Sequence, residues 1–118
     1  MDNETLQNTM LFDFFGDLLT EKQKEYFDLY HNEDLSLSEI AVKAGISRQG
    51  VYDIIARAEK SLIEMESKTG VVQRWQETRT GLRHAESLAN ELLSQAGLDE
   101  KTVDLASQIV MALTMLDD

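Results

Sequence analysis

The stretch LSLSEIAVKAGISRQGVYDIIARAEKSLIEM, from Leu35 to Met65, predicts two helices joined by a tight turn. The first helix places its apolar residues on one face, and Gly45 followed by Ile46 supplies the reversal. Ser47 then opens a second, longer helix. Two helices joined by a short glycine turn are typical of a helix-turn-helix, whose second helix can enter the major groove of DNA.

The composition favours an all-α fold with one compact domain and a helical appendage. The chain has 118 residues, no proline and no cysteine, and 42% of its residues are apolar. Without cysteine there is no disulfide, no thiolate zinc site and no cysteine nucleophile. We expect a helix-turn-helix domain over residues 1–68 and a C-terminal helical extension over residues 69–118.

Capping signals mark the helix starts on the N-terminal side of the turn. Residues 4–15 carry apolar side chains at helical spacing, which predicts one amphipathic helix with its aromatic residues in the core. Thr20 with Gln23, and likewise Ser36 with Glu39, pair a hydroxyl with Gln or Glu three residues later. This capping-box pattern predicts helices that begin directly after Thr20 and Ser36.

The helix that starts at Ser47 has an apolar stripe longer than a helix-turn-helix requires. Its members recur at three- and four-residue spacing and are Val51, Ile55, Ala58, Leu62 and Met65. Two interpretations stay open at this point. The stripe packs inside the chain's own core, or its far half pairs with another helix as a short coiled seam.

The C-terminal extension predicts two further helices. Residues 72–96 carry small and apolar residues in three-four spacing, and Gly97 ends that run. The last helix, which follows Glu100, is apolar over a wide arc. Because two helices cannot bury so much apolar area alone, we expect the extension to fold back on the domain or to meet its copy in a homodimer.

The net charge of −11 would repel a polyanion as a whole, but the charge is unevenly distributed. Residues 1–35 hold two lysines against nine acidic residues, a balance of −7. Residues 36–60 hold four basic against three acidic residues, a balance of +1, and residues 61–118 account for −5. The helix-turn-helix is therefore the one segment that is not negative, which favours a weak DNA reader in an acidic scaffold.

Candidate DNA-contacting residues gather around the start of the second helix. In this motif the first residues of that helix face base edges, and a helix N-terminus favours a phosphate. Arg48 suits guanine and Gln49 suits adenine, while Tyr52 can hold a phosphate. The predicted DNA-contacting set is Lys43, Ser47, Arg48, Gln49, Tyr52, Arg57 and Lys60.

Two neighbouring residues complicate this surface. Asp53 is repelled by the DNA backbone and tolerates at best a cytosine amino group. Gly50 costs about 1 kcal/mol against Ala in a helix, but it leaves the backbone open to close approach of a phosphate or of the preceding helix. The alternative interpretation is a three-helix fold that keeps its shape without DNA affinity.

No pattern indicates catalysis. His31 and His84 lie far apart without a neighbouring ligand pattern, and we expect both at the surface. The carboxylates spread over helix faces, and no nucleophile, phosphate-binding glycine loop or metal motif accompanies them. We therefore expect no enzyme, no cofactor and no metal site.

The sequence predicts neither secretion nor membrane insertion. No apolar run approaches the roughly 20 residues needed to cross a bilayer. The beginning MDNETLQN is acidic and polar where a secretory signal would be basic. We expect a cytoplasmic protein.

Two families resemble this sequence. The run from Leu19 to Leu62 resembles region 4 of bacterial sigma factors in its LT opening, its SLSEIA segment and its GIS turn. More closely, the segments FDFF, LLTEKQ, SLSEIA and SRQGVYDII resemble the YlxM family of small helix-turn-helix proteins, over residues 3–68. Beyond that range the chain shares only the family's habit of a helical C-terminal extension used for dimerisation.

The resemblance to the YlxM family implies a DNA-binding or regulatory protein. Genes of this family typically neighbour those of signal recognition particle components, which implies those components as partners. Against the sigma pattern the chain departs where DNA is contacted, because Gly50, Tyr52 and Asp53 stand where sigma factors usually carry Arg, Arg and Gln.

Two functions follow as hypotheses. The first is a dimeric regulator that binds duplex DNA weakly through Arg48, Gln49, Tyr52 and Arg57. The second is an acidic adaptor for a basic protein or ribonucleoprotein, without physiological DNA binding, for which the resemblance implies the signal recognition particle.

Overall fold

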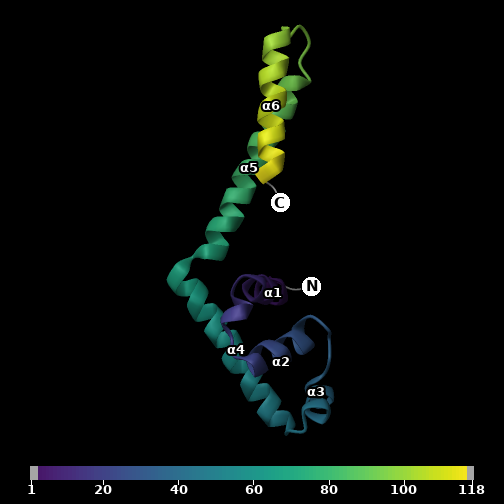
Figure 1. Cartoon of the computed structure of the whole chain (residues 1–118), viewed down its shortest axis with the longest axis vertical. Helices are drawn as coiled ribbons and strands as arrows, with labels where there is room; N and C mark the ends of the chain where they lie inside the picture. The colour runs from purple at the N-terminus through teal and green to yellow at the C-terminus, as the bar shows by residue number, and fades with distance from the viewer. Residues whose placement is uncertain (1–2, 117–118) are drawn as a thin grey trace. The chain divides into compact units, whose positions relative to one another are not determined.

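The computed structural model describes residues 3–116, which form six α-helices and one short 3₁₀ turn (Figure 1). The elements are α1 (Asn3–Phe15), η1 (Gly16–Leu18), α2 (Glu21–His31), α3 (Leu37–Ala44), α4 (Arg48–Thr69), α5 (Val71–Leu93) and α6 (Glu100–Leu116). No strand occurs within this range, so the all-α prediction is confirmed. None of these helices is long and apolar enough to cross a bilayer.

The chain divides into two compact units, of which the first ends at Val72 and the second begins at Gln73. The N-terminal unit contains the helix-turn-helix formed by α3 and α4, together with α1 and α2.

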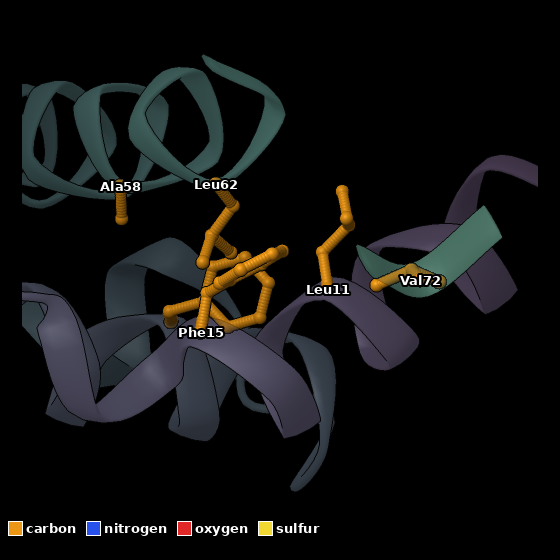
Figure 2. Close-up of a cluster of buried hydrophobic side chains, with 6 residues drawn as sticks. Leu11, Phe15, Ala58, Leu62 and Val72 are labelled. Atoms are coloured by element: carbon orange, nitrogen blue, oxygen red, sulfur yellow. The ribbon is translucent and has the colours of Figure 1, made fainter. Parts of the chain in front are cut away.

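A first hydrophobic cluster joins α1, α2, α4 and the first residues of α5. Its buried members are Leu11, Phe15, Phe27, Ala58, Leu62 and Val72. Leu62 on α4 points toward Phe15 on α1 (Figure 2). The ring of Phe12 stacks on that of Phe27 with 4.9 Å between centroids. Burying each large apolar side chain contributes about 1.5–3 kcal/mol, so this cluster is a principal source of the unit's stability.

A second cluster joins α2, α3 and α4. Its buried members are Tyr26, Leu29, Ile40, Ala41, Val51 and Ile55. Ile40 and Val51 have no exposed surface, so the two helices of the helix-turn-helix are fixed against each other by apolar contact. α4 thus supplies residues to both clusters.

The apolar stripe of α4 is therefore used inside the chain. Val51, Ile55, Ala58 and Leu62 are all buried, and Met65 packs against the first cluster. The interpretation of intramolecular packing is confirmed, and the alternative of a coiled seam along these residues is wrong, because α1 and α2 already cover the stripe.

Both predicted capping boxes are present. The Thr20 hydroxyl accepts from the backbone N–H of Gln23, whose side-chain oxygen accepts from the N–H of Thr20. Ser36 and Glu39 make the same reciprocal pair, each bond 3.0 Å long. The hydrogen bond from the backbone of Ser36, and then that from its side chain, lower the pKa of Glu39. These bonds satisfy helix N–H groups that would otherwise lack partners.

His31 is not at the surface, contrary to the prediction. Its side chain is only 11% exposed, and its Nε2 donates to Oε1 of Glu59 at 2.7 Å. The imidazole also lies 4.3 Å from the ring of Phe27, between centroids. The prediction failed because the partner Glu59 belongs to α4, and only tertiary packing brings the two residues together. His84 is exposed, as predicted.

The C-terminal unit is built from α5 beyond Val72 and from α6. α5 ends at Leu93, about one turn before the predicted end, and the N–H of Ser94 is shared there between the carbonyls of Asn90 and Glu91. Gly97 then adopts a left-handed φ of 79°. A carboxylate oxygen of Asp99 accepts from the N–H of Thr102 at 2.7 Å and starts α6.

The two helices of the C-terminal unit bury little of their apolar surface. Within this unit one small residue on each helix is buried, Ala89 on α5 and Ala106 on α6. Large apolar side chains on the same helices are 40–77% exposed, namely Trp75, Leu88, Leu92, Val103, Leu105, Ile109, Met111, Met115 and Leu116. This unit therefore displays an unusual amount of apolar surface for a domain in water.

Candidate nucleic-acid interface

The turn between α3 and α4 has the geometry that the sequence predicts. Gly45 ends α3 with a left-handed φ of 72°, a conformation that favours glycine. The N–H groups of Gly45 and Ile46 both donate to the carbonyl oxygen of Ala41. Ser47 follows as the N-cap, and its hydroxyl accepts from the N–H of Gly50 at 2.9 Å. The reversal is thereby fixed at both helix ends.

Gly50 leaves room for this cap. A Cβ atom at residue 50 would lie 3.1 Å from the Ser47 hydroxyl oxygen and 3.6 Å from the end of the Ile46 side chain. The close neighbour of Gly50 is therefore the turn itself. From the sequence, the candidates for this close neighbour were a phosphate and the preceding helix.

Four cations on the two helices of the helix-turn-helix project into solvent. Lys43 on α3 and Arg48, Arg57 and Lys60 on α4 are all exposed. None of the four has a hydrogen-bond or ion-pair partner within the described part of the chain. Their charges are thus free to meet an anion.

The start of α4 is electrostatically open to an anion. Its first turn contains no acidic residue, and the free N–H groups of a helix N-terminus carry partial positive charge. Arg48 is the first residue of α4. A phosphate at this end would meet both the helix dipole and a guanidinium group.

The remaining predicted residues differ in how available they are. Tyr52 is 53% exposed, which leaves its hydroxyl accessible. The side-chain amide of Gln49 donates to a carboxylate oxygen of Asp53 at 2.9 Å, one turn along α4. Ser47 is exposed, but its hydroxyl oxygen already accepts the capping hydrogen bond. Gln49 therefore has to release Asp53 before both ends of its amide can address an adenine.

Five of the predicted residues are exposed and have no side-chain partner in the described range, namely Lys43, Arg48, Tyr52, Arg57 and Lys60, whereas Ser47 and Gln49 make local hydrogen bonds. Sequence reasoning missed the pairing of Gln49 with Asp53, although their four-residue spacing on a helix was a sufficient signal. It also missed the bond between His31 and Glu59, because only tertiary packing brings α2 and α4 together.

Comparison with known proteins gives one consistent result. The family model described as "Putative helix-turn-helix protein, YlxM / p13 like", of the UPF0122 family, matches residues 2–105. A UPF0122 protein of Thermoanaerobacter sp. (strain X514) is 53% identical over 77 residues, which are 65% of this chain and 66% of that protein. A UPF0122 protein of Bacillus thuringiensis (strain Al Hakam) is 38% identical over 117 residues, which are 99% of this chain and 100% of that protein.

The two relatives are matched over different lengths. The match spans slightly less than two thirds of the Thermoanaerobacter protein's own length, whereas the Bacillus protein is matched from end to end. A third relative, from Caldanaerobacter subterraneus subsp. tengcongensis, is 51% identical over 77 residues.

Proposed function

Because the chain belongs to the UPF0122 family of YlxM/p13-like helix-turn-helix proteins, we propose that it is a regulatory protein that binds duplex DNA through the N-terminal half of α4. The observation that carries this proposal is the set of four exposed cations without partners on α3 and α4, Lys43, Arg48, Arg57 and Lys60. The family description names a helix-turn-helix protein and no enzymatic activity.

The roles of the individual residues follow from their chemistry. In this proposal Arg48 at the helix start contacts a guanine edge or a phosphate, and Tyr52 contacts a phosphate. Arg57, Lys60 and Lys43 supply phosphate contacts, which position the protein without reading sequence. The net charge of −11 opposes association, so we expect weak binding with a strong dependence on salt.

The test is fluorescence anisotropy of the full chain with a short labelled duplex of mixed sequence, over a series of salt concentrations. We expect Arg48→Ala and Arg57→Ala each to weaken binding and to reduce the slope of log K against log salt by about 1. The matched control is Lys22→Ala on α2, which removes the same charge from an exposed residue outside the helix-turn-helix and outside the proposed dimer interface. Binding that is absent at low salt, or equal losses for Lys22→Ala, would contradict the proposal.

The exposed apolar surface of the C-terminal unit supports a homodimer as part of this function. A second copy is the occupant that the charge pattern of α5 favours. Residues 73–83 contain three arginines and one glutamate, whereas residues 84–93 contain two glutamates and neither Lys nor Arg. An antiparallel pair of α5 helices would place each basic half against an acidic half, as a two-fold interface requires.

Sedimentation equilibrium of the full chain tests the dimer. Ile109 is 52% exposed on α6, and we expect Ile109→Glu to shift the equilibrium to monomer, because a buried unpaired carboxylate is costly. The control is Gln108→Glu, which adds the same charge at an exposed polar residue of the same helix. A chain that is monomeric at all concentrations, or a dimer that tolerates Ile109→Glu, would exclude this interface.

The charge of the N-terminal residues supports a second candidate function, that of an acidic adaptor. Residues 1–35 carry −7, and most of their described carboxylates are exposed, which suits a basic protein or ribonucleoprotein. The components of the signal recognition particle are the partners that the family resemblance implies. Titration of the labelled chain with the purified protein and RNA of that particle tests this function. Saturable binding that weakens with salt is expected, and its absence at low salt would end this candidate.

A further inference from the structure

A polar cleft opens in the N-terminal unit where α1, the end of α2, the segment leading into α3, and α4 meet. Its volume is about 580 Å³. Six of its lining residues carry polar or ionisable groups that matter here, namely Asn8, Tyr30, His31, Asp34, Glu39 and Glu59. None of the residues in the proposed DNA surface lines this cleft, so the inference stands apart from DNA binding.

Asn8 is the observation that points to a ligand. It lies on α1, is only 8% exposed, and is buried together with otherwise apolar residues. Its side-chain amide makes no hydrogen bond with any residue of the described range, and it lines the cleft. Buried amides almost always have partners. A group bound in the cleft would supply the missing one.

The carboxylates of the cleft have unused capacity for donors. A carboxylate can accept about four hydrogen bonds. Glu59 accepts one from His31, and Glu39 is bonded within its capping box. Asp34, which has a left-handed φ of 58°, makes none with another described residue. The bonds from Ser36 lower the pKa of Glu39, so this carboxyl is ionised at neutral pH.

The charge and the rings together select the class of ligand. Three acidic residues line the cleft, and no Lys or Arg does, so the complementary ligand is a cation. Tyr30 and His31 present aromatic rings at the same place, 5.0 Å apart and edge to face. A planar guanidinium suits this arrangement better than an ammonium, because it donates to two carboxylates at once and packs flat against rings.

We propose that this cleft is a binding site for a guanidinium group, held by Asp34, Glu39 and Glu59 with the side-chain oxygen of Asn8 as a further acceptor. The group belongs either to an arginine side chain of a partner protein or to a small free guanidino compound. Both sources offer the same chemistry to the cleft. They differ in the atoms that lie beyond the guanidinium group.

The first experiment is a titration of the isotopically labelled full chain, followed by NMR at the side-chain amide of Asn8. The probes are a short capped peptide with one arginine, the same peptide with lysine or with the uncharged isostere citrulline, and agmatine as a free guanidino compound. We expect saturable shifts of the Asn8 amide with the arginine peptide or with agmatine. We expect at least about tenfold weaker binding of the lysine and citrulline peptides. The tighter of the two guanidinium probes identifies the source.

The second experiment removes the negative charge of the cleft while keeping its shape. The variant combines Asp34→Asn, Glu39→Gln and Glu59→Gln. Asn tolerates a left-handed φ, and Gln completes a capping box as Gln23 does after Thr20. The control combines Asp13→Asn, Glu64→Gln and Glu91→Gln, three exposed carboxylates outside the cleft that give the same change in net charge.

We expect the cleft variant to lose at least about tenfold in affinity for the guanidinium probe and the control to retain it. Melting curves verify that both variants fold, and Glu39→Gln alone replaces the triple variant if that one does not. The proposal is overturned by equal binding of the citrulline or lysine peptide, by equal losses in the control, by retained binding in the cleft variant, or by no shift at Asn8 at millimolar probe.

Discussion

The side-chain amide of Gln49 donates a 2.9 Å hydrogen bond to the carboxylate of Asp53, on the exposed side of α4. This contact keeps a candidate base-reading group in an intramolecular bond and places a negative charge within the proposed DNA surface. It therefore opposes DNA affinity in two separable ways, through charge and through the hydrogen bond.

We expect Asp53→Asn to raise affinity for duplex DNA at low salt by roughly fivefold, because an adjacent unit charge is worth about 1 kcal/mol in water. Asn can still accept from Gln49, so this variant tests charge alone. Asp53→Ala removes both effects and should bind at least as tightly. Anisotropy titrations of the three proteins measure the difference, and weaker binding by Asp53→Asn would mean that Asp53 itself contacts DNA.

The cap of α4 and its first glycine should be energetically coupled. Ser47→Ala removes the hydroxyl that accepts from Gly50 and should cost about 0.5–2 kcal/mol in the free energy of unfolding. Gly50→Ala alone should gain less than the ~1 kcal/mol of helix propensity, because its Cβ crowds the Ser47 oxygen at 3.1 Å. When Ser47 is already replaced by Ala, Gly50→Ala should stabilise the fold by the full ~1 kcal/mol of helix propensity. A urea-denaturation double-mutant cycle measures this, and additive effects would disprove the coupling.

The capping carboxylate of α3 should make stability depend on pH in the acid range. Since the folded-state pKa of Glu39 is lowered from 4.5, the ionised form is favoured in the folded state. Glu39 therefore contributes fully to the free energy of unfolding at a pH above its pKa in the unfolded chain. This contribution is lost as the pH falls through the lowered pKa of the folded state. Glu39→Gln keeps a capping residue but cannot titrate, so its melting temperature should fall less between neutral pH and about pH 3.

The control for this pH dependence is Glu64→Gln, an exposed carboxylate on α4 with no hydrogen bond to another described residue. Its melting temperature should follow that of the unmodified chain across the same range. Asp99 should behave as Glu39 does, because the side-chain hydrogen bond with Thr102, and then the backbone one, lower its pKa from 3.8. If the melting temperatures of Glu39→Gln and of the unmodified chain fall equally between neutral pH and about pH 3, the ionised carboxylate of Glu39 does not stabilise the folded state.

Two leucine truncations should separate the core from the exposed surface. Leu62 has no exposed surface, so Leu62→Ala should cost about 2–5 kcal/mol through lost burial and the cavity left behind. Leu105 is 51% exposed on α6, and Leu105→Ala should cost well under half as much in dilute, monomeric protein. Urea denaturation at low protein concentration makes the comparison. A large loss for Leu105→Ala there would reveal packing that the exposed fraction does not indicate.

The parts of the fold that the sequence predicted well depend on neighbours in the chain. Thr20 with Gln23 and Ser36 with Glu39 act over three residues, and Gly45 acts through its own backbone, so these features can be read without tertiary knowledge. The end of α5 was predicted too late because no capping residue like Thr20 or Ser36 marks it, and helix ends vary by a few residues. The bond of His31 to Glu59 joins residues 28 positions apart, and no local pattern encodes it.

The same distinction between local signals and tertiary packing applies to the candidate binding surfaces. Exposure of Arg48, Tyr52 and Arg57 follows from the period of the buried stripe on α4, and the structure agrees with it. The burial of the unpaired side-chain amide of Asn8, and the cleft that it lines, depend on how α1 packs against α2 and α4. Such a site becomes visible only once the helices are assembled.

α4 packs into the core with one face and carries the proposed ligand surface on the other. This has a thermodynamic consequence for any ligand that binds to the outer face. Val51, Ala58 and Leu62 on its inner face have no exposed surface, so this helix is complete before a ligand arrives. Association then orders side chains alone and incurs no entropy of helix formation. The heat capacity should change only by the amount that the contact surface itself accounts for, and calorimetry at several temperatures would distinguish this from folding coupled to binding.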